Sequence, residues 1–139
     1  MGKEDDALLA TILHDRVHSV VYRLLDARGW VLKFGTTNDP RDRYGKYLRG
    51  EVEKCSEFAH LIRKMQVIAS GISEGEAREL ETDLIKEARM AGQAIYNVVE
   101  ETGIQWRGRD LWDSPPLPRI THRPVDIPRP ISRKGLYTT

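Results

Sequence analysis

The order of apolar and polar residues in the first half of the chain predicts a helix followed by a β-hairpin. In residues 4–17, leucine and isoleucine recur at helical spacing behind an acidic start, which is typical of a short amphipathic helix. Residues 19–26 and 30–37 are rich in β-branched and aromatic side chains, and the three-residue loop between them ends in Gly29. This combination predicts two antiparallel strands joined by a tight turn.

Capping residues mark two further helices. The run Asn38-Asp39-Pro40 combines a capping side chain with a proline that suits the first helical position, so a helix is expected over about 40–49. Ser73 and Glu76 form a capping-box pattern at the start of a helix over about 74–91. Between the two helices the pattern favours a helical segment over 56–65 and a third strand over 65–70.

Proline sets the C-terminal part apart from the rest. Six of the seven prolines fall between Pro115 and Pro130, and they exclude a regular helix or a central strand there. The expected fold is therefore α+β, with a small mixed or antiparallel three-stranded sheet and flanking helices. The predicted parts are an N-terminal helix (1–18), a core (19–104) and an extended proline-rich arm (105–139) held against the domain or a partner.

Length and composition limit the class of protein. A chain of 139 residues corresponds to one domain. No stretch approaches the ~20 apolar residues of a membrane helix, and residues 1–10 lack the order of a signal peptide. A cytoplasmic site of action is therefore expected. Cys55 is the single cysteine, which excludes an internal disulfide and a multi-cysteine zinc site.

Charge is unevenly distributed although the net charge is only +1. Seven basic residues and three acidic ones lie between Arg23 and Arg49, whereas six acidic and two basic residues lie between Glu74 and Glu87. Such runs are usually solvated faces, but a basic stretch also suits contact with nucleic acid. The total charge alone points to no partner.

Glu81 stands out on the predicted helix over 74–91. With about 100° per residue, it falls within the apolar stripe of that helix, formed by Ala77, Leu80, Leu84, Ile85 and Ala88. A carboxylate on a core-facing stripe is costly unless it is protonated, paired or bound to a metal. Glu81 is thus a candidate functional residue, and a buried ion pair with an arginine is the alternative.

Several short motifs follow one another in a recognisable order. The chain reads V-Y-R-L over 21–24 and K-F-G-T over 33–36, followed by Arg43 and, four residues later, Tyr47. An L-E-T-D-L-I segment over 80–85 and the pair Tyr96-Asn97 complete the set. This order and spacing over residues 19–98 resembles the GIY-YIG nuclease family.

The resemblance implies a metal-dependent endonuclease acting on DNA. It implies that Glu81 holds one divalent cation, Mg²⁺ or Mn²⁺, and that Tyr22 acts as general base or relay toward the attacking water. It further implies that Arg43 clamps the phosphate, that Tyr47 positions or shuttles the proton, and that Asn97 orients the substrate or a neighbouring residue. Without the resemblance, Arg43 is an ordinary exposed helix residue and Asn97 a turn or capping asparagine.

Two positions depart from the family pattern. Val20 and Val21 replace Gly-Ile in the first motif, which is a conservative change for a strand. Lys33 occupies the position of the second tyrosine, where an ammonium group could still bind the scissile phosphate as a point charge. The basic residues that would contact flanking phosphates on the same helix as Arg43 are Arg41, Lys46 and Arg49.

Several biological readings are compatible with these residues. A compact nuclease without a separate recognition module resembles the nuclease tips of bacterial polymorphic toxins, which implies an immunity protein as a partner. A DNA-repair or mobile-element nuclease is the alternative, as is a non-catalytic nucleic-acid-binding module of the same fold. A protein-interaction role for the Pro-Pro-Leu-Pro segment (115–118) is a further class. The sequence leaves the oligomeric state open.

Overall fold

The computed structural model describes residues 3–52, 56–90 and 122–130. Their elements alternate along the chain, and the first helix, α1 (Lys3–His14), precedes a hairpin of β1 (Ser19–Leu25) and β2 (Val31–Thr37). Helix α2 (Pro40–Leu48), a short 3₁₀ helix η1 (Ser56–Leu61) and strand β3 (Lys64–Ile72) follow. Helix α3 (Glu74–Met90) and strand β4 (Val125–Asp126) complete the described part.

The strands form one antiparallel sheet in the order β2-β1-β3-β4. Tyr22 of β1 is directly opposite Gly35 on β2 and Val67 on β3, so the first motif lies on the central strand pair. The α+β class and the hairpin are confirmed. The sheet has four strands instead of the expected three, because part of the C-terminal segment pairs with β3.

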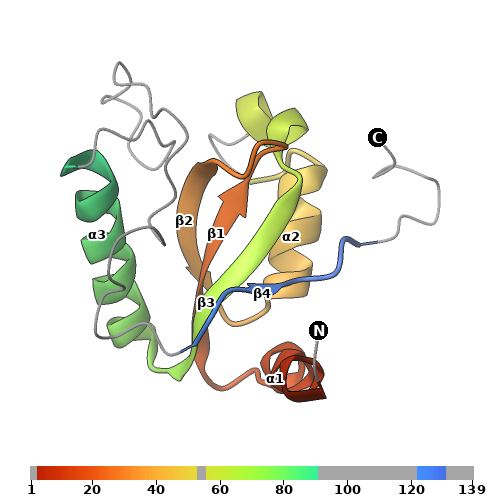
Figure 1. Cartoon of the computed structure of the whole chain (residues 1–139), viewed down its shortest axis with the longest axis vertical. Coiled ribbons are helices and arrows are strands. Elements are labelled where there is room, and N and C mark those ends of the chain that lie inside the picture. The colour runs from red at the N-terminus through yellow and green to blue at the C-terminus, as the bar shows by residue number, and fades with distance from the viewer. Residues whose placement is uncertain (1–2, 53–55, 91–121, 131–139) are drawn as a thin grey trace.

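Helices cover both faces of the sheet, as Figure 1 shows with α3 on one side and α2 on the other. Leu80 and Leu84 of α3 pack on Val21 and Phe34 in one apolar cluster. The second cluster, on the opposite face, brings together α1, α2, η1 and β4. Its largest buried members are Ile12, Tyr22, Leu24, Tyr44, Tyr47, Phe58, Ile62 and Met65. Helix α1 therefore shares a core cluster with Tyr22 and Tyr47.

Local capping fixes where α2 and α3 begin. The Asp39 side chain accepts a hydrogen bond from the backbone N–H of Asp42, and Pro40 occupies the first turn. The Ser73 hydroxyl accepts from the Glu76 backbone N–H, and the Glu76 carboxylate accepts in return from the Ser73 backbone N–H. Both predicted starts are confirmed. The expected helical segment over 56–65 is a 3₁₀ helix that ends at Leu61, after which β3 begins.

The described stretch of the proline-rich arm is fixed to β3. The Ile127 backbone N–H donates to the Met65 carbonyl at 2.9 Å, and Gln66 Nε2 donates to Asp126 at 2.7 Å. Val125 and Ile127 are buried in the same cluster as Tyr22. Because β4 is an edge strand, its presence is consistent with the prediction that the prolines exclude a central strand from this segment.

Some predictions concern residues outside the described ranges, namely Asn97, Cys55 and the Pro-Pro-Leu-Pro segment. They remain predictions. Within the described ranges, every helix is too short or too polar to cross a bilayer.

Candidate active site

A pair of buried tyrosines forms the centre of the candidate site. Tyr22 of β1 and Tyr47 of α2 are each 2% exposed, and their hydroxyl oxygens are 2.7 Å apart, within hydrogen-bond distance. The rings meet edge to face, with centroids 6.0 Å apart and an interplanar angle of 73°. Tyr47 is one helical turn beyond Arg43, so the two side chains leave α2 on the same side.

Gly35 provides the space that Tyr22 occupies. A Cβ atom at this position would overlap the hydroxyl oxygen and the ring of Tyr22. Because both residues are buried, neither has solvent into which it could move. The glycine of the K-F-G-T motif is therefore required by the tyrosine of the V-Y-R-L motif.

We expect the two tyrosine hydroxyls to be energetically coupled. In a double-mutant cycle with Tyr22→Phe and Tyr47→Phe, the coupling in the free energy of unfolding should be about 0.5–1.5 kcal/mol, the range of a single hydrogen bond. Chemical denaturation of the four proteins measures it. Additive effects of the two substitutions would show that the hydroxyl contact contributes nothing to stability.

Burial strongly affects the ionisation of Tyr22. Desolvation is the main cause that raises its pKa well above the usual value, and the hydroxyl of Tyr47 and the charge of Glu81 raise it further. The positive charge of Arg43 acts in the opposite direction. Tyr22 therefore keeps its proton at neutral pH, and the charges of Arg43 on α2 and Glu81 on α3 both act on it.

Glu81 lies half-buried on α3, within the stripe predicted for it. Desolvation raises the pKa of its carboxyl group, whereas the positive charges of Lys33 and Arg78 lower it. Lys33, on β2, thus acts electrostatically on the carboxylate. The alternative of a buried ion pair is not what the described residues show, because Glu81 forms no ion pair or hydrogen bond with any of them.

Three charged side chains, Lys33, Arg43 and Glu81, act on Tyr22 or on one another without forming direct pairs. In the part of the chain that the structure describes, the side chains of Lys33, Arg43 and Glu81 make neither hydrogen bonds nor ion pairs. A half-buried carboxylate without a partner is costly. Two cationic groups and a carboxylate that lack direct partners among the described residues are suited to a ligand that carries both negative charge and a metal ion.

The donor set fits a magnesium ion held by few protein ligands. Within residues 3–52, 56–90 and 122–130, no three His, Cys, Asp or Glu side chains come together as a metal cluster. Mg²⁺ commonly binds to one or two carboxylates and completes its octahedron with waters and phosphate oxygens. Glu81 is a half-buried carboxylate of this kind.

The predicted DNA contacts on α2 lie on its exposed surface. Arg41, Lys46 and Arg49 are all solvent-exposed. Lys46 pairs with Asp42 at 3.3 Å, and Arg49 pairs with Glu51. Such exposed pairs contribute little stability, so their cations can exchange a carboxylate for a phosphate.

Two histidines that the sequence places four residues apart do not form a pair. Helix α1 ends at His14, and His18 lies beyond it, where its Nδ1 atom is 3.0 Å from the Asp15 carboxylate.

Arg78 is the residue near the site that the sequence did not single out. It is three positions before Glu81 on α3, a spacing that places the two side chains on the same face.

Three comparisons with known proteins gave matches only among solved structures. No protein-family model matches the chain, and no curated protein sequence matches it. Among solved structures, it is similar to the N-terminal endonuclease domain of UvrC from Thermotoga maritima bound to magnesium. Identity is 25%, coverage is 64% of this chain and 94% of that chain, and the TM-score is 0.44. This structure and the related Thermotoga maritima structures that match are GIY-YIG endonuclease domains.

Point mutants of the same Thermotoga domain, bound to its catalytic divalent cation, match equally well. One has 25% identity over 64% of this chain and 93% of its own, with a TM-score of 0.44. Another has 24% identity over the same shares of the two chains.

Proposed function

We propose that the chain is a metal-dependent endonuclease that hydrolyses phosphodiester bonds in DNA. The observation that carries this proposal is that Arg43 and Glu81 act electrostatically on Tyr22 of the buried tyrosine pair and Lys33 acts on Glu81, while none of these three charged side chains forms an ion pair or hydrogen bond with a described residue. A scissile phosphate would supply the negative charge for the two cations, and a divalent cation would supply the positive charge for the carboxylate. The group as a whole therefore suits phosphoryl chemistry.

The two cationic side chains have different tasks. Arg43 offers a planar guanidinium group that can clamp two phosphate oxygens at once and stabilise the charge that gathers there in the transition state. Lys33 offers a point charge from β2, beside Glu81. Together they bind the phosphate and orient it toward the carboxylate.

Glu81 would hold the divalent cation. A cation bound there would supply Lewis-acid polarisation of the phosphate and a water molecule of lowered pKa. Without a bound cation, the half-buried Glu81 carboxyl group has a raised pKa because it is poorly solvated. Lys33 and Arg78 keep the carboxylate ionised and thus able to act as a ligand.

The tyrosine pair is suited to relay a proton. Because Tyr22 is protonated at neutral pH, it can accept a proton from water only as its own proton passes to Tyr47 across the 2.7 Å contact and the Tyr47 proton passes on to a further acceptor, such as a phosphate oxygen of the substrate or a solvent molecule. Such a relay leaves no buried phenolate. The raised pKa thus favours the relay over a permanently ionised base as the role of Tyr22.

Cleavage of supercoiled plasmid by the purified protein tests the proposal. We expect Mg²⁺-dependent nicking that EDTA abolishes. Arg43→Gln should lower the rate by about 10²–10³-fold, the usual effect of removing a group that stabilises transition-state charge. Lys86→Gln is the matched control, since it removes an exposed cation from α3 and should leave the rate unchanged.

A parent protein that does not cleave DNA with Mg²⁺ or Mn²⁺ would contradict the proposal, as would equal rates for the two variants. The non-catalytic binding module would then be the better account. An antibacterial effector with an immunity protein and a DNA-repair or mobile-element nuclease would all use this same reaction. The proposal is therefore independent of the biological context.

A further inference from the structure

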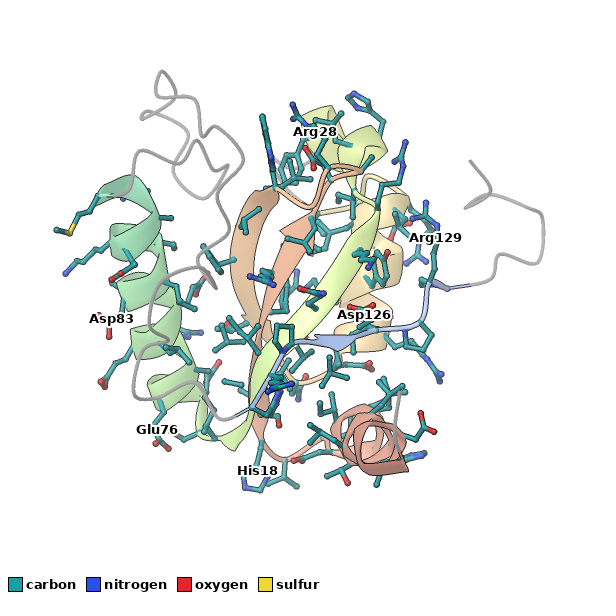
Figure 2. All side chains as sticks on the ribbon, viewed as in Figure 1. His18, Arg28, Glu76, Asp83, Asp126 and Arg129 are labelled. Atoms are coloured by element: carbon teal, nitrogen blue, oxygen red, sulfur yellow. The ribbon has the colours of Figure 1, made fainter. Side chains whose placement is uncertain are left out.

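An open groove of about 390 Å³ lies beside Arg43. It is found where β1 begins and β2 ends, between the first turns of α3 and the loop that leads into α2. Its lining residues are Val17, Ser19, Thr36, Thr37, Asn38, Arg43, Glu74 and Arg78. In Figure 2, the nearby residues His18 and Glu76 lie at the same end of the molecule.

The groove wall combines neutral hydrogen-bonding groups with two guanidinium groups. Ser19, Thr36 and Asn38 contribute hydroxyl and amide groups, while Arg43 and Arg78 contribute positive charge. Contacts of proteins with the DNA backbone use this set of side chains, because phosphate and sugar oxygens accept from arginines, hydroxyls and amides. The composition of the wall therefore suits a sugar-phosphate chain.

A stripe along α3 connects the groove to Glu81. Glu74, Arg78 and Glu81 are spaced by four and three residues, so they follow one face of the helix. With a rise of about 1.5 Å per residue, Arg78 is about 4.5 Å and Glu74 about 10 Å along the axis from Glu81. The charge of Arg78 lowers the pKa of Glu81, which agrees with this proximity.

Arg78 is held in the groove mouth by a contact that a phosphate can replace. Its Nη2 atom is 3.0 Å from a Glu74 carboxylate oxygen, and both side chains are about 70% exposed. Exposed pairs of this i,i+4 type contribute little. A phosphate that reaches Arg78 would therefore meet a guanidinium group available for exchange and a competing carboxylate from Glu74.

We propose that this groove binds the backbone of the DNA strand next to the scissile phosphate. Arg78 contacts the adjacent phosphate, the polar wall contacts the sugar, and Glu74 weakens binding by competing for Arg78. This inference rests on the proposed endonuclease function. It adds a contact track on α3 to the cations predicted on α2.

Binding of a short fluorescent DNA duplex, measured by anisotropy in EDTA over a range of NaCl concentrations, tests the proposal without hydrolysis. Arg78→Gln should weaken binding several-fold and reduce the slope of log K against log salt by about 0.9, the contribution of one phosphate contact. Glu74→Gln should tighten binding. Lys86→Gln, on the same helix outside the groove, should change neither quantity.

The opposite signs expected for the two groove variants exclude a general loss of folding as the cause. If Arg78→Gln and Glu74→Gln bind as Lys86→Gln does while the parent cleaves plasmid, the groove proposal is overturned and the endonuclease stands. If the parent neither cleaves nor binds DNA, the endonuclease proposal fails and the groove proposal fails with it.

Discussion

Glu81→Gln is expected to abolish cleavage while leaving the fold at least as stable at neutral pH. The amide keeps the size of the side chain but removes the charge that would hold the divalent cation. We expect a rate loss of at least about 10²–10³-fold, comparable with the loss of a principal transition-state stabiliser. Plasmid nicking with Mg²⁺ measures it.

The expected stability follows from the direction of the pKa shift. Since the pKa of Glu81 in the folded chain is raised above its usual 4.5, the folded state favours the protonated carboxyl group. Its stabilising contribution is complete below about pH 4.5 and is lost as pH rises through the folded-state pKa. At pH 7 the ionised, half-buried carboxylate is therefore a cost that glutamine removes, and the melting temperature of the variant should equal or exceed that of the parent.

Magnesium should separate this effect from a defect in folding. A ligand that binds only the folded state raises the melting temperature, so Mg²⁺ should stabilise the parent and leave Glu81→Gln unchanged. Glu87→Gln, on the same helix, should retain the magnesium response. An equal response in the parent and in Glu81→Gln would show that Glu81 is not the metal ligand.

Gly35→Ala is expected to damage both stability and activity. The added methyl group would occupy the space of the Tyr22 hydroxyl and ring. Both Gly35 and Tyr22 are buried, so neither can move into solvent. Overpacking of this kind costs about 1–3 kcal/mol, and more where backbone must shift. Displacing Tyr22 also breaks its contact with Tyr47, so cleavage should fall even at temperatures where the variant remains folded.

Gly75→Ala provides the matched control. Gly75 lies in the first turns of α3 on the surface, and the nearest atom to an added Cβ is the Ser73 hydroxyl oxygen at 4.0 Å. Alanine there should keep activity and add up to about 1 kcal/mol of helix stability. Denaturation curves for the two variants compare them directly, and a Gly35→Ala protein as stable and active as the parent would refute the packing requirement.

Local signals explain why most of the fold could be predicted from the sequence. The starts of α2 and α3 depend on the Asp39 side chain with Pro40 and on the Ser73–Glu76 box, each confined to a few residues. The hairpin depends on a loop in which Gly29 adopts a positive φ of 84°. Interactions of this kind are encoded within a short window.

Elements that depend on distant partners were harder to predict. Strand β4 is two residues long, lies between prolines, and exists because Gln66 and Val67 of β3 present a free edge to it. No pattern of residues within the proline-rich arm predicts such a pairing. The segment over 56–65 has helical periodicity, but only one 3₁₀ stretch forms before β3 begins at Lys64.

In the candidate site, too, features with a local signal could be predicted, whereas features that depend on distant residues could not. Glu81 could be identified from its position in the apolar stripe, because helical periodicity is a local property. The approach of Lys33 to Glu81 depends on the packing of α3 against β2, which the sequence does not state. Arg78 was missed because an exposed arginine four residues after a glutamate is typical of any solvated helix.

The pairing of β4 with β3 has a consequence for how the molecule behaves at high concentration. An uncovered strand edge offers its backbone N–H and C=O groups to another chain, and such edges promote aggregation. Residues 125–126 occupy this edge beside Gln66 and Val67, and the prolines that flank them cannot donate a further ladder hydrogen bond. This short strand thus prevents another chain from pairing with β3 at these residues. Its effect on aggregation is separate from the chemistry at Glu81.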